Sequence, residues 1–181
     1  MIDNKMKKLI LVMFLSFSLT STFSQKFFNL NDTAFQIGEI YRADIIWDLS
    51  GRPQIHEQSY GIMDSIVDFL KKNKNISVEF DVFSFLKSNT SFANTFTIKR
   101  AEDLIDWCVY KGIDSNRLTY KAYTNIEPII VDEETNKIYP FLKLGQVLDD
   151  KYINSLDSIE KRKCANKLNR RTEIKITKTW L

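Results

Sequence analysis

The feature that most constrains this chain is a repeated switch between helical and strand periodicity over residues 57–123. Apolar residues recur every three or four positions between residues 57 and 73, which is typical of an amphipathic helix, as Tyr60, Met63, Ile66, Val67 and Leu70 show. Ile76, Val78, Phe80 and Val82 then alternate with polar residues, which predicts a strand with one buried face. A second helix is predicted from residue 97 to 111 and a third strand from Arg117 to Tyr123. This alternation predicts an α/β fold.

Two further strands flank this region. The segment from Gly38 to Asp48 is rich in β-forming residues, and Thr172, Ile174 and Ile176 alternate with polar residues in a strand predicted from residue 171 to 177. Residues 124–143 carry Pro and an acidic turn and are expected to be irregular, whereas residues 149–168 form a polar helical segment. The order βαβαβαβ predicts a two-layer α/β (α+β) sandwich, with helices packed on one face of a mixed sheet.

The first 24 residues have the pattern of a secretory signal peptide. Lys5, Lys7 and Lys8 precede an apolar run, which fades into small and hydroxyl side chains before Gln25. A permanent membrane anchor is the alternative, but it calls for about 20 apolar residues, more than this stretch provides. No Cys lies near the cut, so a lipid anchor is not expected. We therefore expect residues 1–24 to be removed on export, residues 25–37 to form an N-terminal leader, and residues 38–178 to form one domain.

The composition argues against several classes of function. Removal of residues 1–24 takes away three Lys and one Asp, so the formal charge falls from +3 to +1. A nearly neutral body offers little attraction to nucleic-acid phosphates. The chain has 1 His and 5 Gly, which excludes a site of several histidines and a glycine-rich phosphate loop. The sequence therefore predicts neither a metal nor a cofactor, and it predicts no enzyme.

Cys108 and Cys164 are the two cysteines of the chain. Two cysteines in an exported protein allow one disulfide. Cys108, however, is in phase with Ala101, Leu104 and Ile105 on the apolar stripe of the second predicted helix, where a free thiol packs as a small hydrophobic group. Both possibilities remain open from the sequence.

The last third of the chain carries a more specific pattern. Lys111-Gly112-Ile113-Asp114 and Leu118 lie upstream of Asn169-Arg170-Arg171, which leads into an alternating strand. Trp47-Asp48 and Arg100-Ala101 extend the pattern toward the N-terminus. In combination, these motifs resemble the OmpA-like peptidoglycan-binding domains over residues 38–178, and the segment from Leu144 to Ile176 is most similar to versions from the Bacteroidetes group.

The resemblance implies a function in the cell envelope. Members of this family bind the stem peptide of peptidoglycan by gripping the zwitterionic end of diaminopimelate, with a helix Arg on the carboxylate and an Asp on the ammonium. The helix Arg corresponds to Arg100, whose planar guanidinium suits a carboxylate, although a helix-surface Arg that serves solubility or local ion pairing is the alternative. The position of the family Asp is occupied by Phe85, so the ligand motif is degenerate. The nearest acid, Asp81, falls within the regular alternation of the strand and is interpreted as a solvated residue, with a role as the missing anion as the alternative.

Three other residues are candidate helpers of Arg100. Asp48 corresponds to a strand-end Asp beside the ligand loop, although an Asp there also ends strands by bonding to the backbone. Ser84 stands at a family Thr and can donate its hydroxyl to a ligand or simply lie in a solvated loop. Arg170 can contribute to a site that binds an anion, whereas Arg171 is expected to brace the loop before the last strand.

These residues support two hypotheses. The first is a non-enzymatic periplasmic module, associated with the cell wall or outer membrane, that binds diaminopimelate-type peptidoglycan through Arg100, Asp48, Ser84 and Arg170. The second is an interaction module of an outer-membrane or secretion assembly that has lost peptidoglycan binding, with its pocket filled by Phe83 and Phe85. The second hypothesis predicts an envelope protein as the partner.

Overall fold

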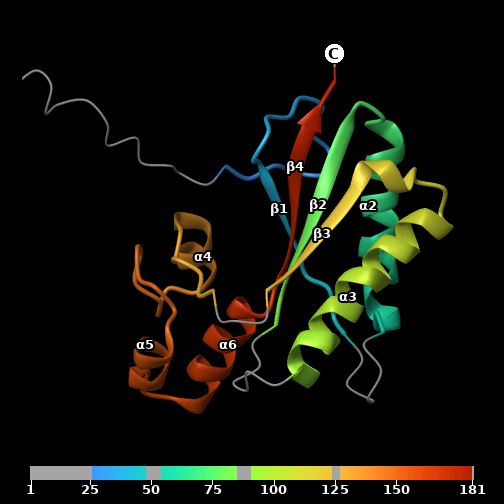
Figure 1. Cartoon of the computed structure of the whole chain (residues 1–181). Helices are drawn as coiled ribbons and strands as arrows, with labels where there is room; N and C mark the ends of the chain where they lie inside the picture. The colour runs from blue at the N-terminus through green and yellow to red at the C-terminus, as the bar shows by residue number, and fades with distance from the viewer. Residues whose placement is uncertain (1–25, 48–53, 85–90, 124–126, 181) are drawn as a thin grey trace, which may run out of the picture.

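The computed structural model describes residues 26–47, 54–84, 91–123 and 127–180, and these contain a four-stranded mixed sheet (Figure 1). Its strands stand in the order β1-β4-β2-β3, where β1 is Ile40–Ala43, β2 is Ile76–Phe83, β3 is Leu118–Tyr123 and β4 is Thr172–Thr179. The last strand lies between β1 and β2 and runs antiparallel to both, whereas β2 and β3 are parallel. The expected mixed sheet is thereby confirmed.

Two helices cover one face of this sheet. They are α2 (Tyr60–Lys72), which follows a short 3-10 turn at Glu57–Ser59, and α3 (Ser91–Tyr110), the crossover between the parallel strands. Met63, Ile66 and Leu70 on α2 and Leu104 on α3 are fully buried against Phe80 of the sheet. Helix α3 begins six residues before the predicted Thr97, which is buried within the helix rather than at its N-terminus.

The segment between β3 and β4 forms a separate lobe beside the end of the sheet (Figure 1). It contains three short helices: α4 (Glu133–Ile138), α5 (Asp150–Ser155) and α6 (Ile159–Asn169). They enclose an apolar cluster of their own, which includes Ile129, Val131, Leu142, Leu148, Ile153 and Ala165. We refer to residues 127–169 as the lobe.

The lobe differs from the sequence prediction in two ways. The helical segment predicted over residues 149–168 is divided in two, because Ser158 accepts a hydrogen bond from the Lys161 N–H at 3.1 Å and starts a new helix. Helix α4 lies in a stretch expected to be irregular, and it is capped by Asp132, which accepts from the Thr135 N–H at 2.8 Å. Side-chain capping explains both differences.

The prediction that β2 has one buried face is wrong. All eight residues of β2 are buried, including Ser77, Glu79 and Asp81, which alternate with the core residues and so face away from α2 and α3. Lys121 of β3 and Lys175 of β4 form ion pairs with the carboxylates on this face. The two acids are therefore both buried and ion-paired. The first strand is also shorter than the predicted 38–48. It begins only after Gly38, which adopts a φ of +92° in the preceding turn, and it ends at Ala43.

The two cysteines do not form a disulfide in the structure. Cys108 is buried and Cys164 half-buried, and both are free thiols, so the disulfide alternative is not realised.

The proposed signal peptide, residues 1–24, lies outside the described residues. Among the helices that are described, none combines the length and the apolar character needed to cross a bilayer.

Candidate anion-binding site

Arg100 lies in the first half of α3 with its side chain largely removed from solvent. Its residue exposure is 9%. One guanidinium nitrogen, Nη1, donates to the Ser84 hydroxyl at 3.4 Å, just beyond the end of β2. The structure thus brings together two of the residues that the sequence nominated, from segments 16 positions apart.

Two aromatic rings flank the guanidinium of Arg100. The Phe96 ring centre lies 4.5 Å from its Cζ atom and the Trp47 ring centre 5.1 Å away. Phe96 precedes Arg100 by one helical turn, so the helix itself places that ring. Cation–π attraction to the two rings stabilises the guanidinium but does not neutralise its charge, so the site remains cationic.

Trp47 reaches this position through a short network of backbone contacts. It forms an isolated antiparallel bridge with Ile55. The Ile55 N–H donates to Asp103 Oδ2 at 3.1 Å, and Asp103 lies on α3 within one turn of Arg100. The segment after β1 is thereby hydrogen-bonded to α3, the helix that carries Arg100.

The charge of Arg100 has no acidic counterpart in the part of the chain that the structure describes. No Asp or Glu there forms an ion pair with it, and its Nε is buried without a hydrogen-bond partner. Burial, and secondly the positive charge of Arg170, lower the pKa of Arg100 to about 10, so the guanidinium is still protonated at neutral pH. A buried cation of this kind is stabilised by an anion, because desolvation without a partner is costly.

Arg170 is placed near Arg100 by the pairing of β2 with β4. The Phe83 N–H donates to the Arg171 carbonyl at 2.9 Å. Ser84, which follows β2, and Arg170, which precedes β4, therefore both lie at this end of the sheet. Arg170 caps the end of α6, is exposed, and forms no ion pair with any described residue. Its charge is therefore available to a ligand.

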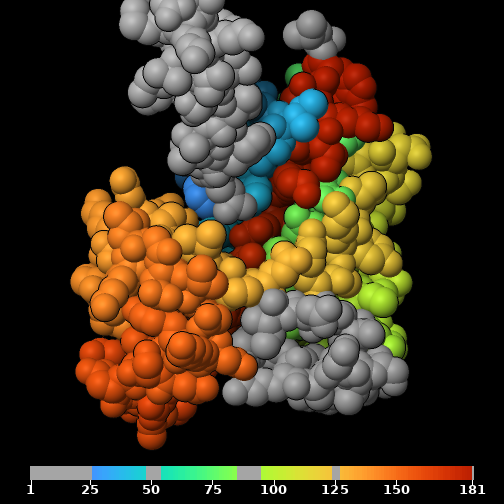
Figure 2. Space-filling view, turned by 60° about the vertical axis from the view of Figure 1, so that its left-hand side comes forward, coloured from blue at the N-terminus to red at the C-terminus, as the bar shows by residue number. Residues whose placement is uncertain are grey.

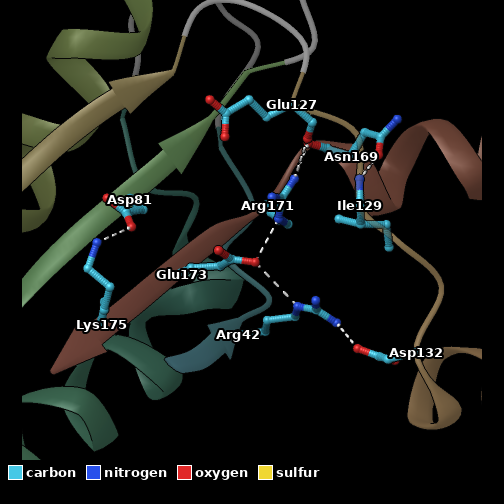
Figure 3. A network of polar contacts seen from close by, with 9 residues as sticks. All are labelled: Arg42, Asp81, Glu127, Ile129, Asp132, Asn169, Arg171, Glu173 and Lys175. Atoms are coloured by element: carbon cyan, nitrogen blue, oxygen red, sulfur yellow. Dashed lines mark hydrogen bonds and ion pairs between the residues drawn. The ribbon is translucent and has the colours of Figure 1, made fainter. Parts of the chain in front are cut away.

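The two neighbours of Arg170 have structural contacts (Figure 3). The Asn169 side chain is buried, accepts from the Ile129 N–H at 3.0 Å and donates to the Leu148 carbonyl at 2.7 Å, which ties α6 to the lobe. Arg171 donates to Glu173 at 2.7 Å and to the Glu127 carbonyl at 3.0 Å. This is the bracing role that the sequence suggested for Arg171.

Asp81 is not the solvated residue that the sequence suggested. It is 4% exposed and accepts from Lys175 at 3.3 Å on the sheet face opposite the helices (Figure 3). Burial raises its pKa to about 6, and repulsion from Glu79 adds to this, while Lys175 acts in the other direction. Asp81 belongs to a polar network of the sheet face.

Two of the nominated positions, Asp48 and Phe85, lie outside the described residues. Two residues that flank the guanidinium, Trp47 and Phe96, were not nominated for this site. For Phe96 the signal was present, since an aromatic residue four positions before a helix Arg shares its face. For Trp47 no local signal exists, because its place depends on the bridge to Ile55.

The remaining polar candidates offer no further chemistry. His56 caps the turn before α2, where its Nδ1 accepts from the Gln58 N–H at 3.3 Å. The described residues contain no group of three His, Cys, Asp or Glu side chains that could hold a metal ion. The arrangement is therefore best described as a candidate binding site for an anionic group, formed by Arg100 and Ser84 with the charge of Arg170 nearby.

Comparison with known proteins gives structural likeness at low identity. No protein-family model matches the chain, and no curated protein sequence matches it significantly. The periplasmic domain of Helicobacter pylori MotB is similar, with 14% identity, a TM-score of 0.48, and coverage of 77% of this chain and 80% of that domain. The OmpA-like domain of FopA1 from Francisella tularensis has 15% identity and a TM-score of 0.42, with coverage of 87% and 94%. The cell wall anchor of the T6SS from Pseudomonas aeruginosa has 17% identity and a TM-score of 0.43, with coverage of 77% and 79%.

Proposed function

We propose that this chain is a non-enzymatic OmpA-like module of the cell envelope that binds the stem peptide of peptidoglycan non-covalently. The observation that carries the proposal is the buried guanidinium of Arg100, which has no carboxylate partner among the described residues. The sequence resemblance to OmpA-like domains assigns a carboxylate of the ligand to this same residue. The signal-peptide pattern of residues 1–24 adds a periplasmic location to the proposal.

In this proposal the ligand carboxylate lies against Arg100 with help from Ser84 and Arg170. The Arg100 guanidinium offers its unpartnered Nε, and the Ser84 hydroxyl, which already accepts from Nη1, can donate its proton to a carboxylate oxygen. Arg170 adds a second positive charge at the solvent side. Diaminopimelate is the proposed ligand group, and Asp48 is the proposed acceptor for its ammonium, because Phe85 stands where the family has an Asp.

Sedimentation with purified diaminopimelate-type sacculi tests this function. Wild-type protein is expected to pellet, and Arg100→Ala to bind at least about tenfold more weakly, since a charge-assisted hydrogen bond contributes roughly 1.5–3 kcal/mol. Lys99→Ala is the matched control, because Lys99 is an exposed cation beside Arg100 on α3. Free diaminopimelate should release the wild-type protein from the sacculi.

The second candidate, an interaction module that has lost peptidoglycan binding, is favoured by Phe85 at the family Asp position. If wild-type protein stays in the supernatant and Phe85→Asp pellets, the interaction module replaces the peptidoglycan-binding module as the conclusion. Equal pelleting of wild type and Arg100→Ala would remove Arg100 from the site and contradict the proposed geometry.

A further inference from the structure

A cleft of about 410 Å³ lies between the first strand and the lobe, apart from the guanidinium of Arg100. On one side it is lined by the leader and β1, including Phe27 and Tyr41, and on the other by α4 and α6, including Ile138 and Leu168. Figure 2 shows these two parts of the chain, the leader and β1 in blue and the lobe in orange, side by side on one face of the molecule. The volume is that of an ordinary ligand pocket.

The floor of the cleft is an open strand edge. β1 is at the edge of the sheet, and in its antiparallel pairing with β4 the peptide groups of alternate residues point outward. Those of Ile40 are occupied by the leader: its N–H donates to the Lys26 carbonyl and its carbonyl accepts from the Phe28 N–H, both at 3.0 Å. An extended segment therefore already pairs with the first half of this edge.

The second half of the edge is left open. After Phe28 the leader turns away, because the Asn29 N–H donates to Asp32 Oδ2 at 2.8 Å and the Asp32 N–H to the Asn29 carbonyl at 3.0 Å. The peptide N–H and C=O of Arg42, two residues beyond Ile40, have no backbone partner on this side among the described residues. Open edge groups of this kind are the usual template for an added strand.

The charges around the cleft are predominantly positive. Its lining includes four cations and two acids, namely Arg42, Lys167, Arg170, Arg171, Asp44 and Glu134. Arg42 and Arg171 are already held by carboxylates, but Lys167 has only a 3.6 Å contact with the exposed Asp44. Arg170 forms no ion pair within the described chain. The α6 side of the cleft therefore presents two cations to whatever lies along β1.

We propose that this cleft is a second binding site, which takes an extended acidic peptide segment of another envelope protein as an added strand beside Arg42. Main-chain hydrogen bonds to Arg42 fix the direction of the peptide, and its aliphatic side chains lie against Ile138 and Leu168. Its carboxylates face Lys167 and Arg170. Arg100 and Ser84 do not line this cleft, which shares only Arg170 with the proposed peptidoglycan site. Together with the proposed function, on which this last step rests, the cleft would let the protein link the cell wall to a second protein.

The probe for this site is a fluorescein-labelled peptide, Thr-Val-Glu-Val-Glu-Val-Thr, with blocked ends. We expect it to bind the wild-type protein and to slow the hydrogen exchange of the Arg42 amide. Two matched peptides are the controls: one with Lys in place of Glu reverses the charge, and one with Pro in place of the central Val removes a strand donor. Both controls should bind much more weakly.

Paired variants on α6 locate the site. Lys167→Glu is expected to weaken peptide binding about fivefold, as for an exposed charge contact, whereas Lys163→Glu makes the same charge change on the same helix away from the cleft and should have little effect. Absence of peptide binding, unchanged exchange of the Arg42 amide, or equal binding of the Pro peptide would overturn the proposal.

Arg100→Ala separates this proposal from the proposed function. It should weaken binding to sacculi at least about tenfold and leave the peptide affinity unchanged, whereas Lys167→Glu should weaken peptide binding about fivefold and leave binding to sacculi unchanged. Loss of peptide binding in Arg100→Ala, with the fold intact by circular dichroism, would show that the two sites are one and overturn the second site.

Discussion

Phe83 and Arg171 contact each other twice, once through the backbone and once through the side chains. The Phe83 N–H donates to the Arg171 carbonyl at 2.9 Å, and the Arg171 guanidinium lies over the Phe83 ring, 3.7 Å from its centre. On its other face, the Phe83 ring stacks on Tyr123, with centres 4.4 Å apart. Three strands, β2, β3 and β4, are thereby joined at the end of the sheet that is followed by Ser84 and preceded by Arg170.

Arg171→Ala should therefore destabilise the fold. It removes the stacking on Phe83 and one of the two guanidinium partners of Glu173, a carboxylate that is 3% exposed. Because Arg42 still pairs with Glu173, we expect a loss of about 2 kcal/mol in the free energy of unfolding, rather than the larger cost of a fully stranded buried charge. Urea unfolding measures the change.

Arg170→Ala is the matched control for this prediction. Arg170 is adjacent in sequence but exposed and without an ion pair among the described residues, so its removal should change stability by less than about 0.5 kcal/mol. An equal loss in both variants would contradict the division between a bracing Arg171 and an available Arg170.

Asp81 should make the fold less stable as the pH rises from about 4 to 7. Its pKa in the folded chain is about 6, above the ordinary 3.8, so the folded state binds the extra proton within this interval. Asp81→Asn keeps the group neutral throughout. The stability of this variant relative to wild type should therefore increase from pH 4 to pH 7, by about 2 kcal/mol, since one pKa unit corresponds to about 1.4 kcal/mol.

Glu79→Gln provides the opposite sign on the same sheet face. Burial acts to raise the pKa of Glu79, but hydrogen bonds from Lys175 and Lys121 outweigh it and hold the pKa below its ordinary value of 4.5. Its stabilisation is present above that value and is lost in acid. Glu79→Gln should therefore cost more stability at pH 7 than at pH 3, as urea midpoints at the two pH values measure. If the stability of both variants relative to wild type changed with pH in the same direction, the opposite pKa shifts proposed for Asp81 and Glu79 would be wrong.

Leu148→Ala should loosen the lobe before the sheet. Leu148 is fully buried in the cluster of the lobe, and its carbonyl accepts from Asn169. Loss of a buried Leu costs about 2–5 kcal/mol, and a separate cluster can open by itself. Hydrogen exchange should therefore become faster in α5 and α6 and stay slow in α2.

Leu70→Ala is the comparison, since Leu70 lies in the main core between α2 and the sheet. It should lower protection throughout the protein. If Leu148→Ala also accelerated exchange in α2 and β2, the two clusters would form one cooperative unit.

The sequence by itself determined the periodic part of this protein. The alternation around Phe80 and the helical spacing of Met63, Ile66 and Leu70 led to the right elements, because apolar side chains on one face of each pack into the main core, although the opposite face of β2 is buried as well. Arg100 could be nominated because it stands next to Ala101 in a recognisable helix motif. The burial of Arg100 could not be predicted, because a helix pattern does not reveal which cation is shielded from solvent by the rest of the fold.

The tertiary structure alone decided how the polar residues are used. Asp81 has the spacing of a surface residue, and only the placement of β4 between β1 and β2 brings Lys175 over it. Trp47 reaches Arg100 only because the chain returns through Ile55 to α3. Periodicity reports the local contrast between water and core, whereas a charge is paired or left unpaired by strands and loops that are distant in sequence.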